Sequence, residues 1–181
     1  MKSWLTICST VTLIAFPLFS CYSRSDSQSN LAPTIESVTK GKVIKIVDGD
    51  TYSLLTGNNI PVKVRMAGID APEKKQPYYQ KAKDFLGQLC FNKVVTIKII
   101  DKDRHGRIVA ETQLDDGRSL SHEMVKNGYA WHFKKYSSDE TLSRLEQQAK
   151  INKAGLWADD QPIAPWEYRA LRKNKGRAPV R

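Results

Sequence analysis

Cysteine is scarce in this chain, with only three among its 181 residues. So low a count excludes a domain held together by a disulfide framework. Ten glycines and eight prolines are too few for a collagen-like or low-complexity chain. No apolar run reaches the roughly 20 residues that a membrane-spanning helix requires. The remaining composition, with 40% hydrophobic residues, is enough for one globular domain with a buried core.

Acidic residues are also in the minority, with 19 Asp and Glu against 29 Lys and Arg, so the formal net charge is +10. Six of the basic residues lie within residues 169–181, where there is no acid. We interpret this segment as a basic, disordered tail, which could add sequence-independent affinity for phosphate. The rest of the chain is only mildly basic, so net charge alone is a weak argument for a nucleic-acid partner.

The N-terminus has the pattern of an export signal. Lys2 precedes a mostly apolar run from Leu5 to Phe19 that is too short to span a membrane. The run ends in Leu18-Phe19-Ser20-Cys21, which resembles the lipobox of bacterial lipoproteins, where the cysteine becomes the lipidated first residue. We therefore predict a signal peptide over residues 1–20 and a lipid anchor at Cys21 that holds the exported protein on a bacterial membrane. Ordinary cleavage, with release as a secreted or periplasmic protein, and an uncleaved anchor are the alternatives.

Residues 21–39 are rich in serine and poor in apolar residues, which predicts a flexible tether between the anchor and the folded domain. We expect the folded domain over residues 40–168 and expect it to be a monomer. Cys8 would leave with the signal peptide, so Cys90 has no partner in the domain. We interpret Cys90 as a small buried residue at a helix end rather than as half of a disulfide.

The domain combines short strands with amphipathic helices. Five runs are typical of β-strands, separated by turn signals; they are residues 43–47, 52–56, 62–66, 94–100 and 107–110. Apolar residues and capping signals indicate three helices, over residues 78–89, 121–126 and 140–149. Five strands with a helix inserted after the third predict an α+β fold of the small-barrel type with peripheral helices.

Charged residues gather in three turns beside apolar strands, where binding and catalytic groups often lie. The turns are Asp48-Gly49-Asp50-Thr51, the segment from Arg65 to Glu73, and Asp103-Arg104-His105-Gly106-Arg107. Asp50 and Asp70 could supply the hard oxygen ligands that Ca²⁺ prefers, and Glu73 could orient or deprotonate a water molecule. Arg65 and Arg107 could clamp phosphate oxygens with paired hydrogen bonds.

Each of these motifs has a simpler interpretation when it is taken alone. Asp-Gly-Asp-Thr is a common hairpin turn, Asp-Ala-Pro-Glu is a proline turn, and an arginine after a glycine usually lies on the surface. The three histidines show no metal-ligand spacing, so we expect surface or packing roles for them. The order and spacing of the motifs along one chain therefore carry the functional hypothesis.

Together the motifs resemble those of the staphylococcal nuclease (thermonuclease) family over residues 40–157. The matching stretches are residues 47–51, 64–65, 69–73, 103–107, 116–117 and 125–128. The resemblance implies an OB-fold, which is a five-stranded Greek-key β-barrel with three peripheral helices. It also implies three Ca²⁺ ligands, which are the carboxylates of Asp50 and Asp70 and the backbone carbonyl of Ala71. The implied catalytic residues are Arg65, Glu73 and Arg107.

Several positions depart from the family pattern. Arg104-His105 replaces the Lys-Tyr pair before Gly-Arg, and the two tyrosines that stack on the nucleotide align with Lys134 and Tyr136. These four are the candidate substrate-binding residues. Ala71 replaces a threonine, which keeps a backbone ligand but loses a hydroxyl near the metal. Because base stacking tolerates any base, these changes bear on nucleotide preference rather than on activity.

The activity that the resemblance implies is Ca²⁺-dependent hydrolysis of phosphodiester bonds in DNA and RNA, with little sequence specificity and with 3′-phosphate products. Glu73 would assist the attack of water in such a reaction. The alternative is a non-catalytic OB-fold module that binds nucleic acid or protein without cleavage. All five catalytic positions hold the residue types that the chemistry needs, which favours the enzyme.

Overall fold

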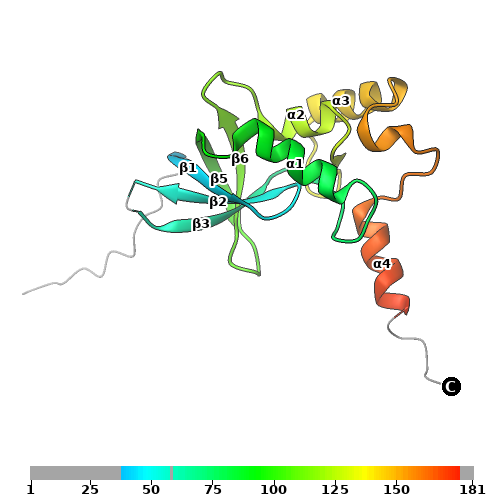
Figure 1. Ribbon diagram of the computed structural model, residues 1–181, viewed down its shortest axis with the longest axis horizontal. Helices are drawn as coiled ribbons and strands as arrows, with labels where there is room; N and C mark the ends of the chain where they lie inside the picture. Colours follow the sequence, from blue (N-terminus) through cyan, green and yellow to red (C-terminus); the bar gives the residue numbers. More distant parts are fainter. Residues whose placement is uncertain (1–37, 58, 176–181) are drawn as a thin grey trace, which may run out of the picture. The chain divides into compact units, whose positions relative to one another are not determined.

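The computed structural model describes residues 38–57 and 59–175, which form a β-barrel with helices gathered on one side of it (Figure 1). Five strands close the barrel in the order β1-β2-β3-β6-β5, and β5 pairs back onto β1. The strands are β1 (Val38–Ile46), β2 (Thr51–Thr56), β3 (Pro61–Met66), β5 (Val94–Lys102) and β6 (Ile108–Leu114). The β3–β6 pair is parallel, and the other four pairs are antiparallel.

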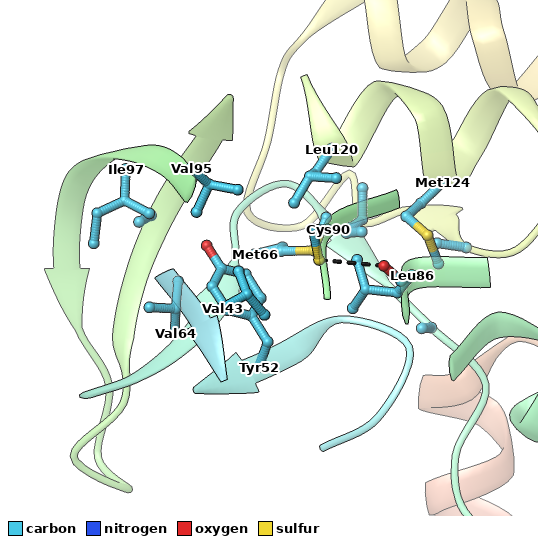
Figure 2. Close-up of a cluster of buried hydrophobic side chains, with 14 of the residues drawn as sticks. Val43, Tyr52, Val64, Met66, Leu86, Cys90, Val95, Ile97, Leu120 and Met124 are labelled. Carbon is cyan, nitrogen blue, oxygen red and sulfur yellow. Dashed lines mark hydrogen bonds between the residues drawn. The ribbon is translucent and has the colours of Figure 1, made fainter. Parts of the chain in front are cut away.

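The barrel forms because apolar side chains at alternate strand positions point inward. Val64 and Met66 of β3, and Val95 and Ile97 of β5, are almost completely buried and meet in the core (Figure 2). Tyr52 is buried, and its hydroxyl forms a 2.8 Å hydrogen bond with the Thr112 hydroxyl. The period-two pattern and the expected α+β OB-type barrel are therefore confirmed.

Three helices lie where the sequence predicts them, namely α1 (Tyr79–Cys90), α2 (Leu120–Lys126) and α3 (Glu140–Ile151). Helix α1 buries Ala82, Leu86 and Cys90 in the core, and Figure 2 shows Leu86 and Cys90 in this cluster. The Cys90 thiol donates to the Leu86 carbonyl at 3.2 Å, and burial raises the pKa of this thiol to about 12. Cys90 is thus a packing residue at a helix end, as predicted.

Three short elements lie outside the barrel. Strand β4 (Ile69–Asp70) pairs with β7 (Trp131–His132), so that Asp70 lies opposite Trp131. A 3-10 helix, η1 (Gly155–Ala158), follows α3. This small second sheet fixes the backbone of Asp70 outside the barrel proper.

A fourth helix, α4 (Pro165–Lys175), corrects one expectation. The predicted disordered tail began at residue 169, but residues 169–175 are helical. Helix α4 starts at a proline, whose fixed backbone angle suits the first helical position, and its Trp166 stacks on Phe133. The prediction of a disordered tail rested on charge alone and used neither Pro165 nor Trp166 as evidence of a helix. Residues 176–181 lie outside the described part of the chain.

The predicted signal peptide, the lipid anchor at Cys21 and nearly all of the predicted tether also lie outside the described residues. Strand β1 begins at Val38, two positions before the predicted domain boundary. Across residues 38–57 and 59–175, no helix has the length and apolar character needed to cross a membrane.

Candidate active site

The two predicted carboxylate ligands come from a turn and a short strand that are packed against each other. Asp50 ends the turn between β1 and β2, and Asp70 lies in β4. The turn fits closely because Gly49 has no side chain, since a Cβ there would lie 2.8 Å from the Cβ of Ala71 and 2.9 Å from that of Ala82. The backbone N–H of Ala71 donates to Asp50 Oδ2 at 2.9 Å, which fixes Asp50 beside the end of β4.

Arg65 of β3 joins the two acids. Its Nη2 lies 3.1 Å from Asp50 Oδ2 and 3.0 Å from Asp70 Oδ1. Its Nη1 donates to the backbone carbonyl of Met66 at 2.9 Å. Because one nitrogen atom reaches both carboxylates, the two acids converge on a single point. Both are buried, with 7% of Asp50 and 2% of Asp70 exposed.

Arg107 enters the same network from the turn before β6. Its Nε donates to Asp103 Oδ2 at 2.7 Å, and its Nη1 donates to Thr51 Oγ1 at 3.3 Å. The Thr51 hydroxyl in turn donates to Asp50 Oδ1 at 3.0 Å. These contacts orient the guanidinium while the side chain remains 28% exposed.

Glu73 lies in the loop after β4, and its side chain is 35% exposed, so water can reach the carboxylate. Its backbone N–H donates to Gln76 Oε1 at 2.9 Å. Gln76 is buried, and its Nε2 donates to the carbonyl of Ile163 at 2.6 Å. Gln76 therefore ties Glu73 to the segment that leads into α4.

Every predicted site residue lines one cleft of about 1640 Å³. The predicted metal ligands and the three predicted catalytic residues line it together with four exposed residues predicted to bind substrate, which are Arg104, His105, Lys134 and Tyr136. The structure thus brings together the residues that the sequence singled out.

Aromatic side chains form one wall of this cleft. Phe133 stacks on Trp166 of α4, with ring centroids 5.2 Å apart and planes within 4° of parallel. Tyr136 packs edge-on against Phe133 at 4.9 Å and is 71% exposed. An exposed ring beside a stacked pair is a suitable platform for a nucleic-acid base.

Arg169 of α4 is the residue that sequence reasoning missed. Its Nη1 donates to Glu73 Oε1 at 2.6 Å, and its Nη2 donates to Asp70 Oδ2 at 2.8 Å. The sequence does contain evidence for the position of Arg169. Pro165 marks a helix start, and a residue three positions after Trp166 lies on the same helix face.

Acids are crowded together in the site, and this shifts the pKa values of two of them. Burial, reinforced by the neighbouring Asp50 carboxylate, raises the pKa of Asp48 to about 7. Burial also raises the pKa of Asp70, although hydrogen bonding from Arg169 opposes that shift. Sequence reasoning gave Asp48 no role beyond the turn. Buried carboxylates that repel one another favour a bound cation at this place.

Within the residues that the structure describes, no group of three or more His, Cys, Asp or Glu side chains is arranged to hold a metal ion. The two convergent carboxylates nonetheless suit a hard cation, because Ca²⁺ prefers oxygen ligands and accepts backbone carbonyls and water among them. Asp50 and Asp70 therefore fit as part of a Ca²⁺ shell, and other oxygen atoms must complete it.

Comparison with known proteins identifies the family of the chain. The family model described as "Staphylococcal nuclease homologue" matches residues 63–159, which is more than half of the chain. An "Uncharacterized endonuclease" of Escherichia coli is 36% identical over 137 residues, which cover 76% of this chain and 89% of that protein. A protein of the same description from Haemophilus influenzae is 42% identical over 132 residues, covering 73% of this chain and 74% of that protein. A "Probable staphylococcal-like nuclease CAN3" of Oryza sativa is 39% identical over 112 residues, covering 62% of this chain and 29% of the plant protein. The chain therefore belongs to the staphylococcal nuclease family of nucleic-acid-hydrolysing enzymes.

Proposed function

We propose that this nuclease hydrolyses phosphodiester bonds in both DNA and RNA, that it depends on Ca²⁺, and that it has little sequence preference. The observation that carries the proposal is the convergence of Asp50, Asp70 and Arg65 on one point in a cleft that Glu73 and Arg107 also line. A surface that only binds nucleic acid does not need a buried pair of acids beside a solvent-accessible third acid.

Glu73 is suited to accept a proton from the attacking water. Its carboxylate is partly exposed, whereas Asp50 and Asp70 are buried. Gln76 holds its backbone in place. A positioned general base of this kind contributes a rate factor of about 10² to 10⁴.

Arg65 and Arg107 are suited to stabilise the charge that develops on the phosphate oxygens. Each guanidinium is oriented in advance, Arg65 by the Met66 carbonyl and Arg107 by Asp103. Groups that are already oriented need no reorganisation during the reaction, which makes their stabilisation of the transition state effective.

Asp50 and Asp70, with the backbone carbonyl of Ala71, would hold the Ca²⁺ ion. When bound, the ion supplies positive charge that polarises the phosphate. The role of the protein is to keep these ligands converged and the cleft open to substrate, which the Ala71–Asp50 hydrogen bond and the β4–β7 pairing support.

The rim of the cleft supports broad substrate use. Arg104 and Lys134 offer cations to backbone phosphates, and His105 and Tyr136 offer rings on which any base can stack. Neither kind of contact reads base identity. The 3′-phosphate products are proposed from family membership alone.

Cleavage assays with the purified protein test the proposal. We expect plasmid DNA, single-stranded DNA and RNA to be degraded in Ca²⁺ and to remain intact when a chelator removes the ion. D70N should lose activity, whereas E167Q, which changes an exposed acid in the same cleft, should keep it. Binding of these nucleic acids without Ca²⁺-dependent cleavage would establish the alternative, a non-catalytic binding module.

We also propose that the protein is exported and anchored through a lipid at Cys21. The apolar run that ends in Leu18-Phe19-Ser20-Cys21 supports this localisation. Cells grown with a radiolabelled fatty acid should label the wild-type protein but not the C21S variant. A wild-type protein that carries no label would instead belong to the secreted or periplasmic class.

A further inference from the structure

Helix α4 brings a third arginine into the site. Arg169 Nη2 donates to Asp70 Oδ2 at 2.8 Å, and Nη1 donates to Glu73 Oε1 at 2.6 Å and contacts Asp70 Oδ1 at 3.3 Å. One guanidinium therefore bridges a proposed metal ligand and the proposed general base. Helix α4 lies beyond residues 63–159, so the family match does not account for this contact.

Two contacts made by residues just before it hold Arg169 beside the acids, although its own side chain is 43% exposed. Trp166, on the same face of α4, stacks on Phe133. The segment before the helix is held by Gln76, whose Nε2 donates to the Ile163 carbonyl at 2.6 Å. Ordinary surface ion pairs lack such support and contribute little. The ion pair between Arg169 and Asp70 also differs from a surface pair, because the Asp70 side chain is only 3% exposed.

Arg65 and Arg169 are held in different ways, although both contact Asp70. Arg65 also donates to the Met66 carbonyl, and this bond does not depend on what occupies the acids. Among the residues that the structure describes, every hydrogen bond from the Arg169 side chain goes to Asp70 or Glu73. A cation that binds Asp70 therefore takes away one of the two acids that hold Arg169 in place.

We propose that Arg169 is the counter-ion of the metal-free site and that it lowers the affinity for Ca²⁺ by competing for Asp70. This inference rests on the proposed function, because it takes Asp70 as a metal ligand. The guanidinium is always charged, so it neutralises the buried acid whenever no ion is bound. A divalent cation at Asp70 repels it. Displacement of Arg169 then also frees Glu73 to act as a base.

Calorimetric titration of the purified full-length chain with Ca²⁺, without nucleic acid, measures this competition directly. We expect R169A to bind Ca²⁺ about tenfold more tightly than the wild type, the size expected when a competing charge-assisted contact is lost. R172A removes an equal charge from an exposed position on the same helix and should leave the affinity unchanged.

Two further variants separate competition from a simple charge effect. R169K keeps the charge but cannot bridge two carboxylates with one planar fork, so it should also bind Ca²⁺ more tightly than the wild type. W166A removes the stacking on Phe133 without changing any group that contacts the acids, and it should shift the affinity in the same direction. Circular dichroism of each variant verifies the fold.

The outcomes distinguish the two proposals. Unchanged or weaker Ca²⁺ binding by R169A would overturn the competition while leaving the metal site intact. Tighter binding by R169A with wild-type affinity for R169K would also overturn it, because net charge would then explain the effect. If neither the wild type nor R169A binds Ca²⁺, the metal site of the proposed function fails, and this inference fails with it.

Discussion

At the scale of single residues, solvent exposure separates the roles of the three acids in the cleft. Asp50 and Asp70 are 7% and 2% exposed, and each is paired with Arg65. The side chain of Glu73 is 35% exposed, so the carboxylate can meet a water molecule. Under the proposed function, the same chemical group would therefore serve as a ligand where it is buried and as a base where solvent reaches it.

Replacement of the proposed base tests this division directly. E73Q preserves the shape of the side chain but cannot accept a proton, so we expect kcat to fall by about 10² to 10⁴. Nucleic-acid affinity and the free energy of unfolding should change little. Single-turnover cleavage and filter binding provide the two measurements, with E167Q as the control for loss of a cleft carboxylate. A wild-type rate in E73Q would remove Glu73 from the mechanism.

Arg107 offers a second test with a closely matched control. We expect R107A to lower kcat by about 10² to 10³, as the loss of a transition-state donor does. Arg118 has a similar local arrangement, because its Nε donates to Asp116 Oδ2 at 2.9 Å, but it does not line the cleft. R118A should therefore cleave at the wild-type rate. Equal losses in the two variants would point to a general effect of charge.

At the scale of elements, the site depends on how closely the β1–β2 turn fits against β4 and α1. Gly49 permits this approach, whereas Gly57, at the end of β2, has open space where a Cβ would lie. G49A should destabilise the fold by about 1–3 kcal/mol, through overpacking, and should weaken Ca²⁺ binding by displacing Asp50. Urea unfolding and calorimetry measure the two effects. G57A is the control, and equal behaviour of the two variants would contradict the role of the close fit.

Strand β7 is linked to α3 through His132, whose Nε2 lies 3.1 Å from the Ser137 hydroxyl and whose Nδ1 lies 3.0 Å from that of Ser143. Burial lowers the pKa of His132, helped by Lys134 and opposed by Glu146. The folded state therefore binds fewer protons than the unfolded state, whose histidine pKa is near 6.5. The contribution of His132 to stability is therefore complete above that value, and it is lost as the pH falls below it toward the lower pKa of the folded state.

Unfolding by urea between pH 8 and 5.5 checks this dependence. The free energy of unfolding of the wild type should fall more steeply over that range than that of H132Q, which cannot be protonated there. The exposed His105 supplies the control, because H105Q should follow the wild-type profile. Parallel profiles for the wild type and H132Q would show that His132 does not cause the loss.

Local signals predicted most elements, because strand alternation and helix capping act over a few residues. Short motifs at turns also predicted Asp50, Asp70 and Glu73 as site residues. Helix α4 and the role of Arg169 were not predicted. Arg169 and Asp70 are 99 positions apart, and the many basic residues around Arg169 looked like a solvated tail. The packing of Trp166 on Phe133 and the hydrogen bonds to Asp70 and Glu73, which place that arginine, form only in the folded chain.

At the scale of the whole molecule, the site is assembled from segments that are distant in the sequence. The acids come from the β1–β2 turn and β4, and the arginines come from β3, the turn before β6 and α4. An unfolded chain cannot bring these groups together. Binding of an ion to the site is therefore coupled to folding of the entire domain.

Thermal unfolding in the presence and absence of Ca²⁺ measures this coupling. A ligand that binds only the folded state at about 100 times its Kd adds about 2.7 kcal/mol. In a domain of this size that corresponds to a rise in Tm of about 5–10 °C. D50N removes one of the two convergent carboxylates, so the difference in Tm between Ca²⁺ and chelator should disappear in this variant. G57A leaves the site unchanged and should retain the full difference. An equal rise in D50N and the wild type would mean that Ca²⁺ stabilises the domain from another place, because only the site between the β1–β2 turn and β4 requires Asp50.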